Sequence, residues 1–189
     1  MLRLAPLAVA LLGVAAGVGV VGAKTYLTRE RALAQVFGAD ATIEPRTVFL
    51  TAAAAKRAES AAGAKLASPR VTAYVGRRGD RVLGTAYLDT HAVRSMNETV
   101  LIVVSPARRV AAVEVLAFNE PGDYLPPRRW LDTFRDRALA RDLKPGAAVP
   151  HLGGSTLTAR AVATAVRRTL AVHAEVEAAL AAEATMEGR

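Results

Sequence analysis

The residues between positions 150 and 158 have the types and the order that bind an anion through the protein backbone. They read Pro-His-Leu-Gly-Gly-Ser-Thr-Leu-Thr and directly precede the longest helical pattern of the chain. Gly153 and Gly154 allow a ligand to approach the main chain closely. The amides that follow are helix-start donors without an intrahelical acceptor, and the helix dipole adds a partial positive charge. This segment therefore predicts a site for a phosphate group or another anion.

A simple helix cap is the alternative interpretation of the same segment. A Ser or Thr side chain at the N-cap stabilises a helix by about 1 kcal/mol without any ligand. Arg160 lies four residues after Thr156 and would add a positive charge that suits an anion. The candidate anion-binding residues are Gly153, Gly154, Ser155, Thr156, Leu157, Thr158 and Arg160.

Aromatic residues gather in a second segment that has a stiff backbone. Residues 119–127 contain three prolines, and four of the nine aromatic side chains lie nearby, namely Phe118, Tyr124, Trp130 and Phe134. Such clustering predicts a slot for a planar ring, with Glu120 and Tyr124 as candidate lining residues. The alternative is that these rings belong to the core, as the helical spacing of Trp130 and Phe134 indicates.

A third segment, residues 89–94, combines Asp89, His91 and Arg94. A hydrolase built on His91 and a serine has little support, because no serine lies nearby in a strained elbow and no second histidine accompanies it. We therefore interpret residues 89–94 as a turn between strands with His91 on the surface. Arg94 is a candidate partner for an anion.

Composition limits the chemistry that the chain can perform. It contains no cysteine, which excludes disulfides, thiolate nucleophiles and iron–sulfur clusters, and its three histidines lack the spacing of helical metal ligands. Any redox chemistry must then come from an organic cofactor. The net charge is +8, from 25 basic and 17 acidic residues, but no run of five basic residues occurs. We therefore expect no nucleic-acid partner.

The amino-terminal segment is long and apolar. Residues 4–23 contain no ionisable side chain, and as a helix they would extend ~30 Å, about the thickness of a bilayer core. We favour an uncleaved transmembrane anchor over a cleaved signal peptide, because a signal core usually has ~7–15 apolar residues. Either interpretation places the rest of the chain outside the cytoplasm, in the periplasm or at the outer face of the cytoplasmic membrane.

Hydrophobic periodicity predicts an α+β fold, in which helices pack on an antiparallel meander sheet. We expect helices over residues 28–36 and 51–62, strands over 71–75, 81–88, 98–104 and 109–118, a helix from 128 through Ala138, and a last helix over 155–182. Leu157 and His173 lie on the apolar stripe of the last helix, and we expect His173 to be buried and hydrogen-bonded. The predicted organisation is an anchor or signal peptide (1–23), a helical lead-in (24–69) and an α+β domain (70–189).

These segments together resemble a known family. Residues 153–158, followed by Ala-Arg-Ala-Val and a long helix, resemble the Ser-Gly-Ala-Thr-Leu-Thr signature of FMN-binding domains. Such domains occur in the flavin-carrying subunits of sodium-pumping NADH:quinone reductase, in regulators of nitrous-oxide reductase and in small membrane-anchored proteins. Residues 98–131 resemble the small-protein branch, and the resemblance covers residues 70–173.

The resemblance implies which residues would hold the cofactor. The family's phosphate-binding threonine, often esterified to FMN by a flavin transferase, corresponds to Thr156, and the loop beside the flavin corresponds to residues 120–122. The chain has Gly153 where the family has Ser or Thr, and Ser155 where it has Ala. Pro150 replaces the acidic residue that the transferase pattern requires, so covalent attachment stays open.

The function that the resemblance implies is that of a membrane-tethered electron carrier. The chain would bind FMN outside the cytoplasm and exchange electrons with membrane-bound electron-transfer proteins, without being an enzyme by itself. The alternative is a flavin-free binding or assembly module whose anion site lies at the same helix start.

Overall fold

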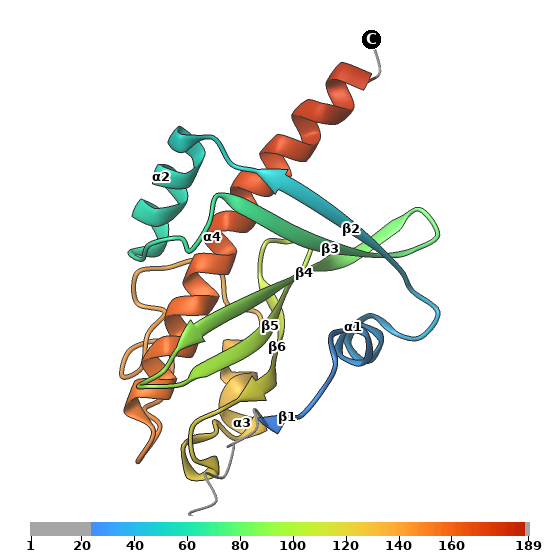
Figure 1. The fold of residues 1–189 in the computed structure, drawn as a ribbon. Coiled ribbons are helices and arrows are strands. Elements are labelled where there is room, and N and C mark those ends of the chain that lie inside the picture. Colours follow the sequence, from blue (N-terminus) through green and yellow to red (C-terminus); the bar gives the residue numbers. More distant parts are fainter. Residues whose placement is uncertain (1–23, 188–189) are drawn as a thin grey trace, which may run out of the picture.

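The computed structural model describes residues 24–187, and its fold is α+β, as predicted from the hydrophobic periodicity (Figure 1). Strands β2 to β6 form an antiparallel meander, and the short β1 extends the sheet beside β6. In chain order the elements are β1 (Lys24–Thr25), α1 (Arg29–Phe37), β2 (Thr42–Phe49), α2 (Ala52–Ala62), β3 (Arg70–Arg78), β4 (Arg81–Ala92), β5 (Asn97–Val104), β6 (Val110–Phe118), η1 (Gly122–Tyr124), α3 (Arg128–Leu131), η2 (Asp132–Phe134) and α4 (Thr156–Glu187).

Helices cover both faces of the sheet (Figure 1). The strand β5 shows why its sequence is a continuous apolar run. Val100 and Ile102 belong to the core cluster beneath α4, whereas Leu101 and Val103 belong to the cluster beneath α1. Because successive side chains of a strand point to opposite faces, a strand covered on both sides must be apolar at every position.

The long helix α4 crosses the sheet and packs against α2 (Figure 1). Val162, Val166 and Leu170 are buried along its apolar stripe, and His173 is buried with them, as predicted. Leu157 was expected on the same stripe but is 43 % exposed. Leu157 therefore points away from the core, whereas Thr158 and Ala159 in the same turn are buried.

The caps of the first two helices follow from the sequence. The Thr28 side chain accepts a hydrogen bond from the Arg31 amide, and the Thr51 side chain accepts one from the Ala54 amide. Gly63 ends α2 in the left-handed conformation that glycine adopts without strain. The predicted helices over residues 28–36 and 51–62 are confirmed.

Three sequence-based expectations need correction. The strand β2 was not expected, and its Pro45 lies at the sheet edge, where a missing amide removes no ladder bond. The strand β4 continues to Ala92, so residues 89–92 are not a turn. The helix predicted from residue 128 through Ala138 ends early, because the chain becomes 3₁₀ and then reaches a positive φ of 61° at Asp136, which leaves Ala138 exposed.

The predicted anchor or signal peptide, residues 1–23, lies outside the described residues. Among residues 24–187, no helix is both long enough and apolar enough to cross a membrane.

Candidate functional site

A pocket of about 250 Å³ lies where three segments meet: the β4–β5 connection, the loop after β6 and the start of α4. Eight of the ten predicted site residues line it, although they come from three separate parts of the sequence. The lining consists of Val93, Arg94, Glu120, Tyr124, Gly154, Ser155, Thr156, Leu157 and Thr158.

The start of α4 presents unpaired donors to this pocket. The first helical hydrogen bond joins the Ala159 amide to the Ser155 carbonyl at 3.0 Å. Within residues 24–187, no group accepts from the amides of Thr156, Leu157 or Thr158. The Ser155 hydroxyl accepts none of these amides, and it donates to the Asp123 carbonyl at 3.4 Å. No side chain in the described part of the chain caps these three amides, so they are free for water or for an anion.

Gly154 has a positive φ of 74°, which favours glycine at this position. No atom lies within 4 Å of where a Cβ would stand on either Gly153 or Gly154. The glycine requirement at position 154 therefore comes from backbone conformation and not from crowding by the protein. Gly153 is exposed and does not line the pocket.

The opposite wall of the pocket is held in place by Glu120. Its Oε1 accepts the backbone amides of Arg94 (3.2 Å), Ser95 (2.8 Å) and Met96 (3.0 Å). The amides of Ser95 and Met96 are the main cause of a lowered pKa for the Glu120 carboxyl. Glu120 was predicted to contact a ligand, but this oxygen is already used to fold the β4–β5 connection.

Arg94 brings a positive charge to the pocket. Its guanidinium carbon lies 5.9 Å from the centre of the Tyr124 ring, within cation–π range. Among the described residues no carboxylate forms an ion pair with this guanidinium, although its charge attracts that of the nearby Glu120 carboxylate. Arg94 is exposed, so its charge is available to an anionic ligand.

The predicted aromatic slot is not formed. Of the four clustered aromatic residues only Tyr124 lines the pocket, because Phe118, Trp130 and Phe134 are buried in the core. The Trp130 and Phe134 rings pack edge to face with their centroids 5.2 Å apart, and the Trp130 indole donates to the Pro150 carbonyl at 2.9 Å. Their role is to fix the segment that leads into α4.

Arg160 does not reach this pocket. It lines a separate hollow between α2, α4 and residues 141–145, together with other basic residues. The expectation that Arg160 would add charge beside Thr156 is therefore not met by its position in the structure.

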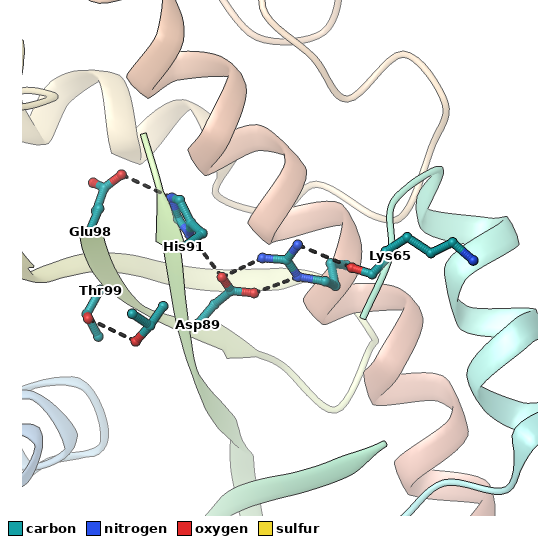
Figure 2. Close-up of polar contacts among 7 residues, drawn as sticks. Lys65, Asp89, His91, Glu98 and Thr99 are labelled. Carbon is teal, nitrogen blue, oxygen red and sulfur yellow. Dashed lines mark hydrogen bonds and ion pairs between the residues drawn. The ribbon is translucent and has the colours of Figure 1, made fainter. Parts of the chain in front are cut away.

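A charged cluster that the sequence did not reveal lies beneath α4. His91 Nδ1 is 2.9 Å from Asp89 Oδ1, and His91 Nε2 is 3.2 Å from Glu98 Oε2 (Figure 2). Arg168 of α4 completes the row by donating to both Asp89 oxygens, at 2.8 and 2.6 Å. The His91 side chain is only 11 % exposed, so the expectation of a surface histidine in a turn was wrong.

The electrostatics of this row follow from alternating charges. Burial alone lowers the pKa of His91, but its contacts with Asp89 and Glu98 outweigh burial and raise that pKa to about 9. Burial would raise the pKa of Asp89, yet hydrogen bonds from His91 and Arg168 hold it below its usual value. Burial raises the pKa of Glu98, whose Oε1 has no partner among the described residues.

His173 fills the role expected of it. Its Nδ1 lies 2.8 Å from the Tyr87 hydroxyl, and the two rings pack edge to face. Burial lowers the pKa of His173. The contact between Tyr87 and His173 joins β4 to the middle of α4. Neither residue lines the pocket.

The fold and the site together define an α+β protein with a pocket at the start of its longest helix. No family model, no curated protein and no solved structure matches the chain. Among residues 24–187, no group of three or more His, Asp or Glu side chains is placed to hold a metal ion.

Proposed function

We propose that the chain binds FMN at this pocket, with the phosphate at the start of α4, and that the bound flavin carries electrons. The observation that carries the proposal is the convergence of the three unpaired amides of Thr156, Leu157 and Thr158 with the unpaired guanidinium of Arg94. Free amides at a helix start and a nearby arginine are the groups that bind a phosphate in proteins.

The residues that line the pocket fit the phosphate of FMN better than they fit the whole cofactor. A pocket of about 250 Å³ is smaller than the ~300–1,000 Å³ of cavities that enclose a drug-sized ligand. The residues that line the pocket would hold the phosphate, and Tyr124 is the aromatic side chain of the lining that a flavin ring could contact.

The chain's own contribution is to bind and orient the cofactor. Electron transfer is the chemistry that FMN supplies when it is bound. The hydroxyl of Thr156, which is exposed at the pocket, would hold the phosphate by a hydrogen bond or as its ester. Glu120 would act indirectly, by holding the β4–β5 connection so that Arg94 faces the phosphate.

The cellular setting of this proposal rests on residues 1–23. With these residues as an anchor, the flavin domain would lie outside the cytoplasm beside membrane-bound electron-transfer proteins. The membrane, such electron carriers and, for covalent attachment, a flavin transferase are the partners that the proposal requires.

The test is to purify the full chain in mild detergent, with and without a co-expressed flavin transferase. Visible absorption and the mass of the intact protein then report bound and covalently attached flavin. Thr156→Val should abolish attachment and weaken binding, whereas Thr156→Ser, which keeps the hydroxyl, should retain both. The absence of flavin in every preparation, together with no binding on FMN titration, would refute the proposal.

A flavin-free anion-binding module is the competing function. Titration of the same preparation with FMN, riboflavin and inorganic phosphate separates the two. The proposal expects FMN to bind more tightly than either fragment, because it engages both the helix start and Tyr124. Equal affinity for FMN and inorganic phosphate would favour the flavin-free module.

A further inference from the structure

A second hollow, of about 780 Å³, lies between the carboxyl end of α2, the first turns of α4 and residues 141–145. Four basic side chains line it: Arg141, Lys144, Arg160 and Arg167. No Asp or Glu is among its lining residues. We call these four residues and the space between them the basic hollow.

Arg167 is the basic residue of the hollow that hydrogen bonds hold in place. Its guanidinium donates to the Ala62 carbonyl at 3.1 Å and to the Leu143 carbonyl at 2.8 Å, and so joins α2 to the segment before Lys144. Burial lowers the pKa of this half-buried guanidinium, and no carboxylate among the described residues compensates its charge. An uncompensated cation in such a position has a desolvation cost that a bound anion would reduce.

The other three cations are exposed and unpaired. Within residues 24–187, the side chains of Arg141, Lys144 and Arg160 have no hydrogen-bond or ion-pair partner. Asp142, which lies between two of them in the sequence, lines a different hollow. Mutual repulsion among four cations favours a multiply charged counter-ion between them.

The one basic residue of α4 outside the basic hollow has an acidic partner. Arg168, one residue after Arg167, is paired with Asp89 at 2.6 Å. Two glutamates of the same helix pair with arginines of other elements, Glu175 with Arg57 and Glu177 with Arg108. These glutamates of α4 therefore pair with arginines outside the basic hollow, and the hollow is left without an acidic partner among the described residues.

We propose that the basic hollow binds a ligand with two or more phosphate groups, either a soluble oligophosphate or the phosphates of anionic lipid headgroups. Arginine binds phosphate oxygens through two parallel N–H bonds, and lysine adds a point charge. The site is separate from the pocket that contains Thr156, so this proposal is independent of FMN binding.

The experiment uses the full chain in nonionic detergent, titrated calorimetrically with inorganic tripolyphosphate. The triple variant Arg141→Gln, Lys144→Gln and Arg160→Gln keeps Arg167, because Arg167 joins α2 to the loop. The matched control is Arg31→Gln, Arg81→Gln and Arg129→Gln, which removes the same charge from exposed arginines outside the basic hollow. We expect about tenfold or greater weakening in the first variant, and less than about twofold in the control.

A competition experiment with lipids identifies the source of the phosphates. The same micelles are doped with phosphatidylglycerol, or with phosphatidylcholine as the control, and competition with tripolyphosphate is measured. Competition by phosphatidylglycerol alone assigns the site to lipid headgroups, and its absence assigns the site to soluble oligophosphates. Equal weakening in both triple variants, or no binding of either probe, would overturn the proposal. FMN titration of the triple variant should match that of the unmodified chain, because none of its three residues lines the pocket that contains Thr156, and this separates failure here from failure of the FMN proposal.

Discussion

Glu120 Oε1 accepts the Ser95 amide at 2.8 Å, and this bond joins the loop after β6 to the connection between β4 and β5. The same oxygen accepts the Met96 amide at 3.0 Å. A carboxylate that accepts several amides fixes a turn in the way that a helix cap fixes a helix. The position of Arg94 at the pocket therefore depends on a residue that need not touch the ligand.

Removal of this carboxylate should loosen the pocket wall. In Glu120→Ala the amides of Ser95 and Met96 lose their acceptor, so we expect faster hydrogen exchange at both and weaker FMN binding. Asp123→Ala removes a neighbouring acid that makes no such bonds and serves as the control. Unchanged exchange in Glu120→Ala would show that the turn is stable without Glu120.

The two adjacent glycines before α4 should respond differently to alanine. Gly154 has a φ of 74°, where a Cβ costs about 1–2 kcal/mol, while Gly153 lacks a positive φ. Gly154→Ala should lower the free energy of unfolding by that amount or shift the start of α4, and Gly153→Ala should be nearly neutral. Urea unfolding of the two variants measures the difference, and equal stabilities would contradict the role given to Gly154.

Residues that lie close together in the sequence predicted one wall of the pocket. Gly154, the hydroxyls and the helix start lie within residues 154–158, and local rules of helix initiation fix their arrangement. The sequence named the residues of the opposite wall, Arg94, Glu120 and Tyr124, as candidates but did not place them together. Their convergence depends on how the meander places two loops side by side, which no local pattern encodes.

Long-range pairing explains what the sequence did not reveal. Arg168 and Asp89 are 79 positions apart, and only the strand register places His91 opposite Glu98. The missed strand β2 contains Pro45, two charged residues and two threonines. This composition is typical of an edge strand that lacks strong alternation. The prediction of a helix from residue 128 through Ala138 was too long, because apolar spacing is a weak signal over so few turns.

Loss of the Arg94 charge should weaken FMN binding in a salt-dependent way. We expect Arg94→Gln to raise the dissociation constant by about five- to tenfold, on the scale of ~1 kcal/mol for an exposed ion contact. Arg94→Lys should retain part of the affinity, because it keeps the charge but loses the planar contact with Tyr124. Titrations at low and high salt provide the measurement, and equal affinity in Arg94→Gln would exclude a phosphate contact. Arg31→Gln removes an exposed arginine far from the pocket lining and is the matched control.

The row of Asp89, His91 and Glu98 should make stability fall at alkaline pH. The pKa of His91 is raised from 6.5 to about 9 by the two carboxylates, so the folded state holds this proton more tightly than the unfolded state. The resulting stabilisation is fully present below about pH 6.5 and is lost as the pH rises through about 9. Its ceiling is ~3 kcal/mol, from 1.36 kcal/mol per pKa unit.

Urea unfolding of the full chain in detergent, between about pH 6 and pH 10, isolates this contribution. His91→Gln cannot titrate, so it should be less stable than the unmodified chain near pH 6, and the difference should shrink toward pH 10. The lowered pKa of Asp89 affects stability only in the acid range, outside this window. His151→Gln, at an exposed histidine, should show the slope of the unmodified chain. Identical slopes for His91→Gln and the unmodified chain would mean that His91 is not held protonated between its two carboxylates.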